Sequence, residues 1–115
     1  MSVPQAPAAH VRTLVAIAVA AAWLVGIGAS AASEVHTVTI DGFEFRPAVV
    51  TVKAGDVVVW RNSDPVPHTV TAQGAGLASS NIAPGGTFRF TARRAGRVDY
   101  LCSLHPTMKG ALVVE

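Results

Sequence analysis

Apolar and polar residues alternate along most of the chain from Ser33 to Glu115, and this pattern is the feature that most restricts its fold. No window in this region has the spacing of a helix with one apolar face, whereas a period of two places successive side chains on opposite faces of a strand. About seven short strands at regular spacing predict an all-β sandwich or barrel. The expected strands are separated by Gly, Pro, Asn or Asp and cover residues 35–40, 43–46, 49–53, 57–61, 68–72, 87–91, 98–102 and 111–114.

Residues 74–86 lie between two of these strands and contain four glycines and one proline. Gly and Pro interrupt regular structure, so we expect this segment to be a long excursion over the surface.

The composition limits what such a domain can be. Residues of the AVILMFWYC set make up 50% of the chain and charged residues only 14%, which excludes a disordered chain. A length of 115 residues holds one domain and excludes an enzyme with a separate cofactor domain. The formal net charge of +2 is too small to indicate a nucleic-acid partner, and none is expected.

The first part of the chain is predicted to be an export signal. Arg12 is followed by an uncharged apolar run, and residues 28–32 are all small. A basic start, an apolar run and a small-residue end are typical of a secretory signal peptide, here residues 1–32, with cleavage at Ala29-Ser30-Ala31. The folded domain then comprises residues 33–115.

An uncleaved membrane anchor is the alternative, because residues 14–32 carry no charge and a membrane-spanning helix needs about 20 such residues. The alanine-rich run and its end in Gly and Ser favour cleavage. In both cases the domain is exported, and we expect it in the periplasm or anchored to a membrane and facing the periplasm. The mature chain has no membrane contact unless the segment is retained.

Four side chains form a candidate metal site. Cys102, His105 and Met108 recur at every third position of one loop, and His68 supplies a second imidazole from an earlier loop. A thiolate, two imidazoles and a weak thioether are the donor set of a blue-copper electron-transfer site. A lone thiol in an oxidising compartment also needs burial, a partner or a bound metal.

Each of these residues also has a simpler interpretation. A single Cys is most often a small buried side chain, and Met108 alone is more often part of a core. Cys102 and His105 could form a thiol nucleophile with its base, but no Asn or Asp that orients the base is evident. Zinc would take the Cys and both His, but a thioether is a poor zinc ligand. His36 lies in an alternating strand with no second ligand nearby, so we expect a surface residue.

At these positions the chain from Asp41 to Glu115 resembles the cupredoxin family, specifically its amicyanin-like and plastocyanin/azurin members. The two-residue gaps on both sides of His105 are similar to the short ligand loop of amicyanin. The matching blocks are residues 43–62, 67–72, 83–91 and 100–115.

The resemblance implies a Greek-key β-sandwich of about seven to eight strands that holds one type 1 copper ion. Its implied ligands are His68, Cys102, His105 and Met108, and the implied activity is one-electron transport by Cu(II)/Cu(I) cycling rather than enzyme catalysis. The alternative is a copper-storing or copper-delivering module without redox turnover. Many family members have Asn after the first His ligand, where it ties the two ligand loops together; here Thr69 takes that place and could reach toward Ser103.

The expected partners are redox proteins that dock transiently on an apolar rim around His105. This rim comprises Leu104 and Pro106 from one loop and residues 65–67 from the other. Weak docking of this kind suits a monomer. Lys109 is the expected steering charge, whereas the basic cluster at residues 93–97 is expected toward the opposite end of the domain.

Overall fold

The protein is described by a computed structural model that covers residues 1–8, 16–18, 20 and 32–115. The predicted cleavage site and most of the apolar run at residues 14–32 lie outside the described residues, so the signal peptide and its anchor alternative stay predictions. In the part of the chain that is described, no helix has the length and hydrophobicity needed to cross a membrane.

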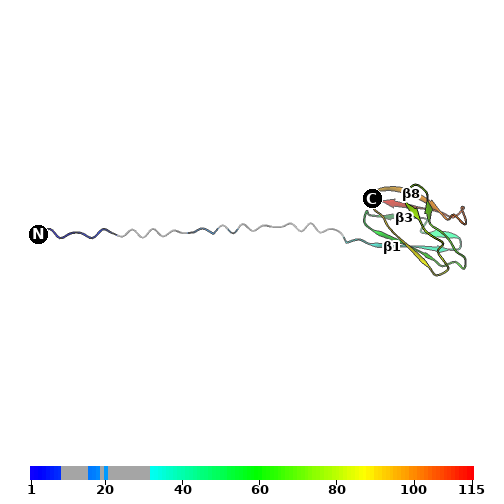
Figure 1. The fold of residues 1–115 in the computed structure, drawn as a ribbon, viewed down its shortest axis with the longest axis horizontal. Coiled ribbons are helices and arrows are strands. Elements are labelled where there is room, and N and C mark those ends of the chain that lie inside the picture. The colour runs from blue at the N-terminus through cyan, green and yellow to red at the C-terminus, as the bar shows by residue number, and fades with distance from the viewer. Residues whose placement is uncertain (9–15, 19, 21–31) are drawn as a thin grey trace.

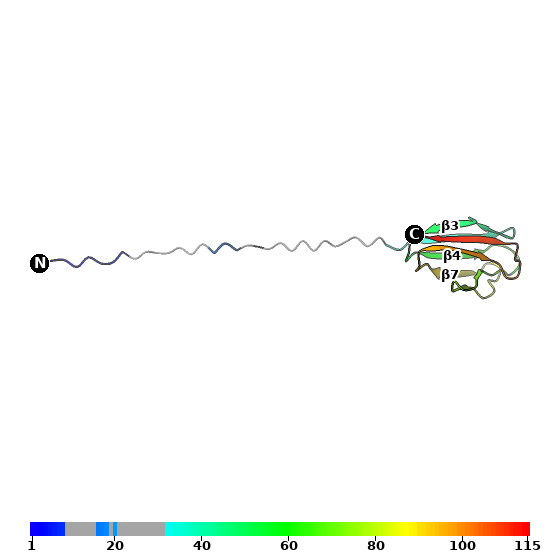
Figure 2. The same cartoon turned by 90° about the horizontal axis from the view of Figure 1, so that it is seen from above.

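Two β-sheets packed face to face make up the domain, which confirms the predicted all-β sandwich (Figures 1 and 2). One sheet has the strand order β2-β1-β4-β7, and the other has the order β3-β9-β8-β5-β6. The chain passes repeatedly between the sheets, and β1 pairs with β4, and β3 with β9, in parallel. The strands are β1 (Val35–Asp41), β2 (Glu44–Arg46), β3 (Val49–Val52), β4 (Val57–Asn62), β5 (Thr71–Ala72), β6 (Leu77–Ala78), β7 (Thr87–Thr91), β8 (Gly96–Leu101) and β9 (Lys109–Val114).

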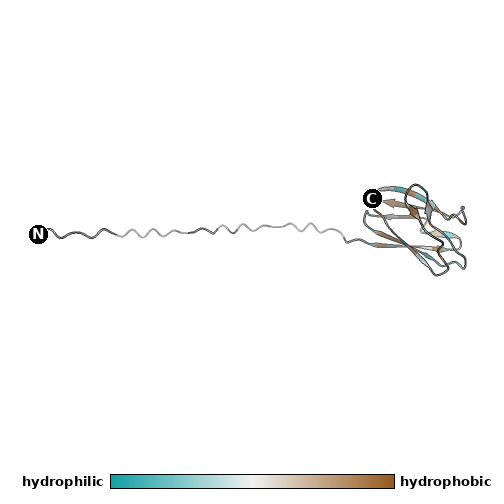
Figure 3. Cartoon of the chain, viewed as in Figure 1, coloured by the Kyte–Doolittle hydropathy of each residue, from teal (hydrophilic) through white to brown (hydrophobic). Residues whose placement is uncertain are grey.

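Side chains along the strands alternate between buried and exposed positions, and the buried side chains fill the space between the sheets. In β4, Val58, Trp60 and Asn62 are fully buried, while Arg61 between them is exposed. Figure 3 shows hydrophobic and hydrophilic residues in succession along the strands. The Trp60 indole donates a hydrogen bond of 3.2 Å to the hydroxyl of Tyr100, which joins the two sheets through the core.

The segment 74–86 differs from the expected surface excursion. It contains the short strand β6, in which Leu77 is almost fully buried, and Ile82 is buried as well. Ile82 also forms an isolated antiparallel bridge with His68. The Gly-rich composition shows where the chain turns, but the two apolar side chains fold the segment back onto the core. This addition explains why nine strands are present instead of seven to eight.

The two ends of the sandwich are different. We call one end the base. The first residues of β1 and β4 lie there, where Val35 pairs with Val57, and so does the last residue of β9, where Val114 pairs with Val52. We call the other end of the sandwich the loop end. There β4 leads into residues 63–70, and β8 leads into residues 102–108. Figure 1 shows the C-terminus at the base and the orange loop after β8 at the opposite end.

Candidate metal centre

Two connections meet at the loop end. Residues 63–70 follow β4, and residues 102–108 follow β8 in the opposite sheet. The first is fixed by the bridge at His68, where backbone hydrogen bonds of 3.2 and 2.8 Å join His68 and Ile82. This pairing positions the His68 side chain under the second loop.

Backbone hydrogen bonds close the second loop into a compact turn. The N–H of His105 donates to the carbonyl of Cys102 at 3.2 Å, and the N–H of Met108 donates to the carbonyl of His105 at 2.9 Å. The N–H of Cys102 donates back to the carbonyl of Met108 at 3.1 Å. The three-residue spacing seen in the sequence therefore brings all three residues to one side of the loop end.

Three of the four predicted side chains converge, those of His68, Cys102 and His105. The sulfur of Cys102 lies 3.7 Å from Nδ1 of His68 and 3.8 Å from Nδ1 of His105. One ligating atom from each of these residues lies within 4.8 Å of the others. Cys102 and His68 are fully buried and Met108 is nearly so, whereas His105 is partly exposed.

A buried carboxylate fixes the ring of His68. Nε2 of His68 lies 2.8 Å from Oδ2 of Asp64, so this nitrogen donates to the carboxylate and Nδ1 is left free as a ligand. Asp64 also accepts the backbone N–H groups of Gly42 and Phe43. Burial alone would raise the pKa of Asp64, but the donors Phe43, Gly42 and His68 together hold it below the ordinary value.

Asn62 braces the same loop from the end of β4. Its amide nitrogen donates to the carbonyls of Val66 and Ile82, and its amide oxygen accepts the N–H of Asp64 at 2.9 Å. Asn62 is fully buried with its side-chain groups paired, so it holds the loop that carries Asp64 and His68 in one conformation.

Thr69 ties the two loops together. Its hydroxyl accepts the N–H of Ser103 at 2.8 Å and lies 2.8 Å from the Ser103 hydroxyl. Its backbone N–H donates to the sulfur of Cys102 at 3.3 Å. The expected reach of Thr69 toward Ser103 is therefore present. The N–H of Ser103 donates to the Thr69 hydroxyl rather than to the sulfur.

Phe43 is a contact of the site that the sequence analysis missed. Its ring meets the rings of His68 and His105 edge to face, with centroid separations of 5.1 and 5.0 Å. The residue has a φ of 60°, in the left-handed region that non-glycine residues seldom adopt. Two hydrogen bonds hold it in this conformation, because the Asp64 carboxylate accepts the N–H of Phe43 and that of Gly42.

The donor set and its geometry fit one copper ion. Metal–nitrogen and metal–sulfur bonds of about 2.0 and 2.3 Å in a trigonal arrangement would place N and S about 3.7 Å apart. The Cys102 sulfur lies 3.7 and 3.8 Å from the two imidazole nitrogens, which matches this spacing. A thiolate with two imidazoles and a nearby thioether matches copper better than zinc.

Comparison with known proteins points the same way. Residues 14–114 match the family model of the cupredoxin-like domain. The chain belongs to the cupredoxin-like family. It is 35% identical over 83 residues to amicyanin-alpha of Methylorubrum extorquens, and the aligned region covers 68% of this chain and 70% of that protein. The match to amicyanin of Paracoccus versutus is 32% identical over 84 residues and spans 63% of that protein. Chloroplastic plastocyanin of Tetradesmus obliquus is 33% identical over 84 residues, 62% of this chain and 58% of that one.

Solved structures give the same family. A Cu(I) form of an amicyanin variant superposes with a TM-score of 0.68 at 30% identity, covering 73% of this chain and 85% of that one. A copper-containing nitrite reductase from Thermus scotoductus superposes with a TM-score of 0.65 at 26% identity, over 70% of this chain but only 22% of the reductase chain.

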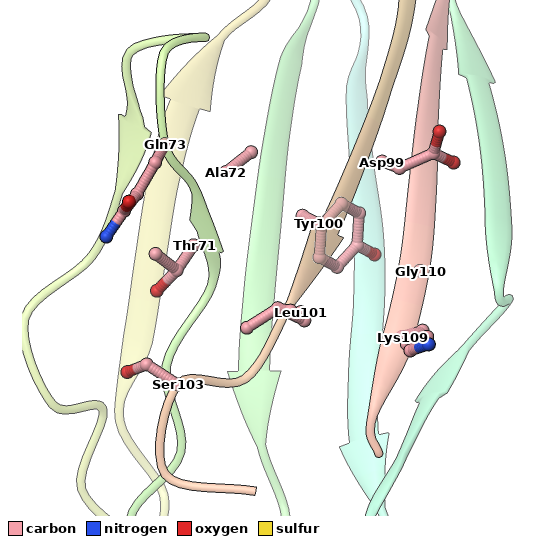
Figure 4. A pocket seen from close by; sticks show the side chains of 9 residues that line it. All are labelled: Thr71, Ala72, Gln73, Asp99, Tyr100, Leu101, Ser103, Lys109 and Gly110. Atoms are coloured by element: carbon pink, nitrogen blue, oxygen red, sulfur yellow. The ribbon is translucent and has the colours of Figure 1, made fainter. Parts of the chain in front are cut away.

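A groove of about 650 Å³ lies beside the ligand loops of this cupredoxin (Figure 4). Leu101, directly before Cys102, lines it together with Lys109 and the core residue Tyr100. Lys109 is exposed and directly follows Met108 in the sequence, and it lines this groove. The lining residues are Thr71, Ala72, Gln73, Asp99, Tyr100, Leu101, Ser103, Lys109 and Gly110.

Two expectations about residues away from the site have different outcomes. The arginines of residues 93–97 follow β7, whose last residue Thr91 pairs with Val57, so they lie at the base as expected. His36 was expected at the surface, and its side chain is partly exposed there, but the expectation that no second ligand lies nearby was wrong. Its side chain is only 23% exposed and its Nε2 lies 2.9 Å from Asp56, which sequence separation had hidden.

Proposed function

We propose that this cupredoxin is an exported one-electron carrier that binds one type 1 copper ion through His68, Cys102, His105 and Met108. The convergence of the two imidazole nitrogens on the Cys102 sulfur, at 3.7 and 3.8 Å, is the observation that carries the proposal. When bound, copper supplies the Cu(II)/Cu(I) couple. The family resemblance to amicyanins and plastocyanins supports electron transport rather than an enzyme activity.

Preset ligand positions suit electron transfer. The His68 ring is held by Asp64, the sulfur accepts an N–H from Thr69, and the loop of residues 102–108 is closed by its own hydrogen bonds. Because these contacts involve no metal, they keep the donors in place in both redox states. Little rearrangement then accompanies the gain or loss of an electron.

Burial distinguishes a carrier from a copper store or delivery protein. His68 and Cys102 have no exposed surface and Met108 is 3% exposed. Transfer of copper to another protein needs ligands that an acceptor can reach, and only His105 offers this. An electron needs no such access, so the burial of three donors favours the carrier.

The partner surface is an apolar rim around His105. Leu104 is 46% exposed, and Phe43, which touches both imidazoles, is also 46% exposed. Pro65, Pro67 and Pro106 are exposed at the ends of the same two loops. A small apolar patch suits weak, short-lived docking, which a carrier needs in order to exchange partners. We expect the carrier to be a monomer.

Copper loading tests the site and the activity together. The loaded protein should be intensely blue, should bleach with ascorbate and should give a reversible one-electron wave in voltammetry. Cys102→Ser should abolish the blue band while circular dichroism still shows a folded β domain. A retained band would refute the ligand set, and a blue protein without reversible voltammetry that hands copper to a chelator would indicate a store.

Matched apolar substitutions test the rim. Leu104→Ser removes an apolar side chain next to His105, and Val35→Ser removes one that is 58% exposed at the base. Electron self-exchange, measured by NMR line broadening in mixed-valence samples, should slow in the first variant only. Equal rates in both variants would place electron entry elsewhere.

Location is tested by cell fractionation of the natural host and by N-terminal sequencing. A protein beginning at Ala32 or Ser33 in the periplasmic fraction would support the signal peptide. A full-length protein in the membrane fraction would support the anchor.

A further inference from the structure

A second group of ligating side chains lies at the base of the sandwich. Glu34 directly precedes β1, His36 is the second residue of β1, and Asp56 directly precedes β4. Nε2 of His36 lies 2.9 Å from Oδ2 of Asp56 and 3.9 Å from Oε2 of Glu34. One ligating atom from each residue lies within 4.8 Å of the other two.

Asp56 is a fixed and charged member of this group. Its Oδ1 accepts the N–H of Glu34 at 2.9 Å, and its Oδ2 accepts the N–H of Lys53 at 2.9 Å. These two backbone donors, followed by the His36 side chain, lower the pKa of Asp56 to about 2. The carboxylate is therefore ionised at every physiological pH and cannot turn away without losing two backbone partners.

His36 and Glu34 leave the group open to solvent. The His36 side chain is 23% exposed, and that of Glu34 is 77% exposed. A tetrahedral metal site with bonds of about 2.0–2.2 Å separates its ligand atoms by about 3.2–3.6 Å. The His36–Asp56 pair needs only a small opening to reach that spacing, and the exposed Glu34 can move closer from the solvent side.

We propose that Glu34, His36 and Asp56 bind one divalent transition-metal cation, with Zn²⁺ as the best match. Two carboxylates balance the charge of the ion, and His36 binds through Nε2 as a neutral imidazole whose single proton is on Nδ1. The proton that Nε2 otherwise donates to Asp56 is released to solvent, and in a neutral ring Nδ1 takes up one in exchange. Water completes the four-coordinate set. The absence of a sulfur donor in this group disfavours Cu(I), so the ligand chemistry differs from that of the blue-copper site.

The two sites are spatially separate. Val35 pairs with Val57 at the base, and β4 ends at Asn62 on the loop end. Five residues of extended strand span about 16 Å, and the two groups share no side chain. Occupation of the base site therefore neither requires nor displaces copper.

The ion would stabilise the start of the fold. It would connect residue 34 and β1 to the turn between β3 and β4, where the chain otherwise depends on the hydrogen bonds to Asp56. Since only the folded chain brings the three ligands together, free Zn²⁺ should raise the unfolding temperature in proportion to the logarithm of its concentration once above its Kd.

Titration of the copper-loaded protein with Zn²⁺ tests the proposal. Calorimetry should show one Zn²⁺ per chain, with the blue absorption band unchanged, and thermal unfolding should shift upward. His36→Gln, which can still donate to Asp56, and Glu34→Gln should each weaken Zn²⁺ binding at least tenfold. Both variants should keep the blue band and the reduction potential of the parent, which shows that they are folded.

Glu44→Gln is the matched control for Glu34→Gln, because Glu44 is an exposed carboxylate paired with Arg46 at 3.4 Å and lies outside the group. Its Zn²⁺ affinity should equal that of the parent. The proposal is overturned if Zn²⁺ fails to bind at micromolar concentrations, if binding survives His36→Gln, or if bound Zn²⁺ bleaches the blue band. Because the copper signals are read in the same sample, failure of this site is distinguishable from failure of the proposed function.

Discussion

Asp64 and His68 form a buried hydrogen bond of 2.8 Å that turns Nδ1 of the imidazole toward the sulfur of Cys102. The same carboxylate accepts the N–H of Phe43, whose ring touches both His68 and His105. One acidic side chain therefore controls the tautomer of one ligand and the position of the ring that covers both imidazoles.

Asp64→Asn should weaken copper binding by about 10–100-fold, the usual effect of removing a carboxylate partner from a ligating His. The amide is a poorer acceptor, so the imidazole becomes less basic and stabilises Cu(II) less. The reduction potential should therefore rise. Competition titration with a chelator and voltammetry measure the two effects.

Asp99→Asn is the control, because Asp99 is an exposed carboxylate paired with Arg97 at 3.1 Å. It should leave affinity and potential unchanged. If Asp64→Asn behaved like this control, Asp64 would have a role only in folding.

Met108→Gln tests the thioether as the weak fourth ligand. An amide oxygen is a harder donor than a thioether and favours Cu(II) over Cu(I), so the reduction potential should fall while copper still binds. Voltammetry of the two proteins in the same buffer gives the comparison. An unchanged or higher potential would count against Met108 as a ligand.

Thr69→Val removes the hydroxyl tie between the ligand loops but keeps the N–H that donates to Cys102. The N–H of Ser103 then loses its acceptor, which should cost about 1–3 kcal/mol of unfolding free energy. Denaturant titrations of the copper-loaded proteins measure this cost. Thr69→Ser retains the hydroxyl and should remain close to the parent; equal losses in both variants would assign the effect to packing.

Three of the four proposed copper ligands could be recognised in the sequence because their chemistry is local. Cys102, His105 and Met108 repeat at one spacing in one loop, and their softness as donors restricts the metal. The alternation within β7 and the run of β-branched residues within β4 likewise predict those strands.

Contacts between distant segments could not be predicted in this way. Asp56 meets His36 across a separation of 20 residues, and Phe43, whose φ is 60°, contacts histidines that lie far from it in the sequence. Leu77 and Ile82 are buried within a Gly-rich segment whose composition indicated only turns. Each of these depends on how the sheets stack and cross, which no local period encodes.

Gly110→Ala should destabilise the fold because β9 passes directly over the ring of Tyr100. A Cβ at position 110 would lie 2.4 Å from Cζ and 2.5 Å from the hydroxyl oxygen of that ring. Tyr100 is 3% exposed and accepts the hydrogen bond of Trp60, so it has little room to move. Overpacking of this kind costs about 1–3 kcal/mol or more, which denaturant unfolding should detect. Lys109→Ala, at an exposed neighbouring position, should change the midpoint little.

Asp56 should make the stability of the domain depend on pH in the acid range. Its pKa in the folded protein is about 2, below the ordinary value of 3.8, because the N–H groups of Glu34 and Lys53 and the side chain of His36 stabilise the carboxylate. A lowered folded pKa means that the unfolded chain takes up the proton first, so this contribution is complete above about pH 4 and is lost as the pH falls toward 2. Thermal unfolding midpoints across this window should therefore fall more steeply for the parent than for Asp56→Asn, which should be less stable than the parent at neutral pH.

Asp99→Asn, which alters an exposed carboxylate, should retain the slope of the parent. Parallel curves for the parent and Asp56→Asn would show that the acid sensitivity arises at other carboxylates, of which buried Asp64 is the first to test by the same substitution.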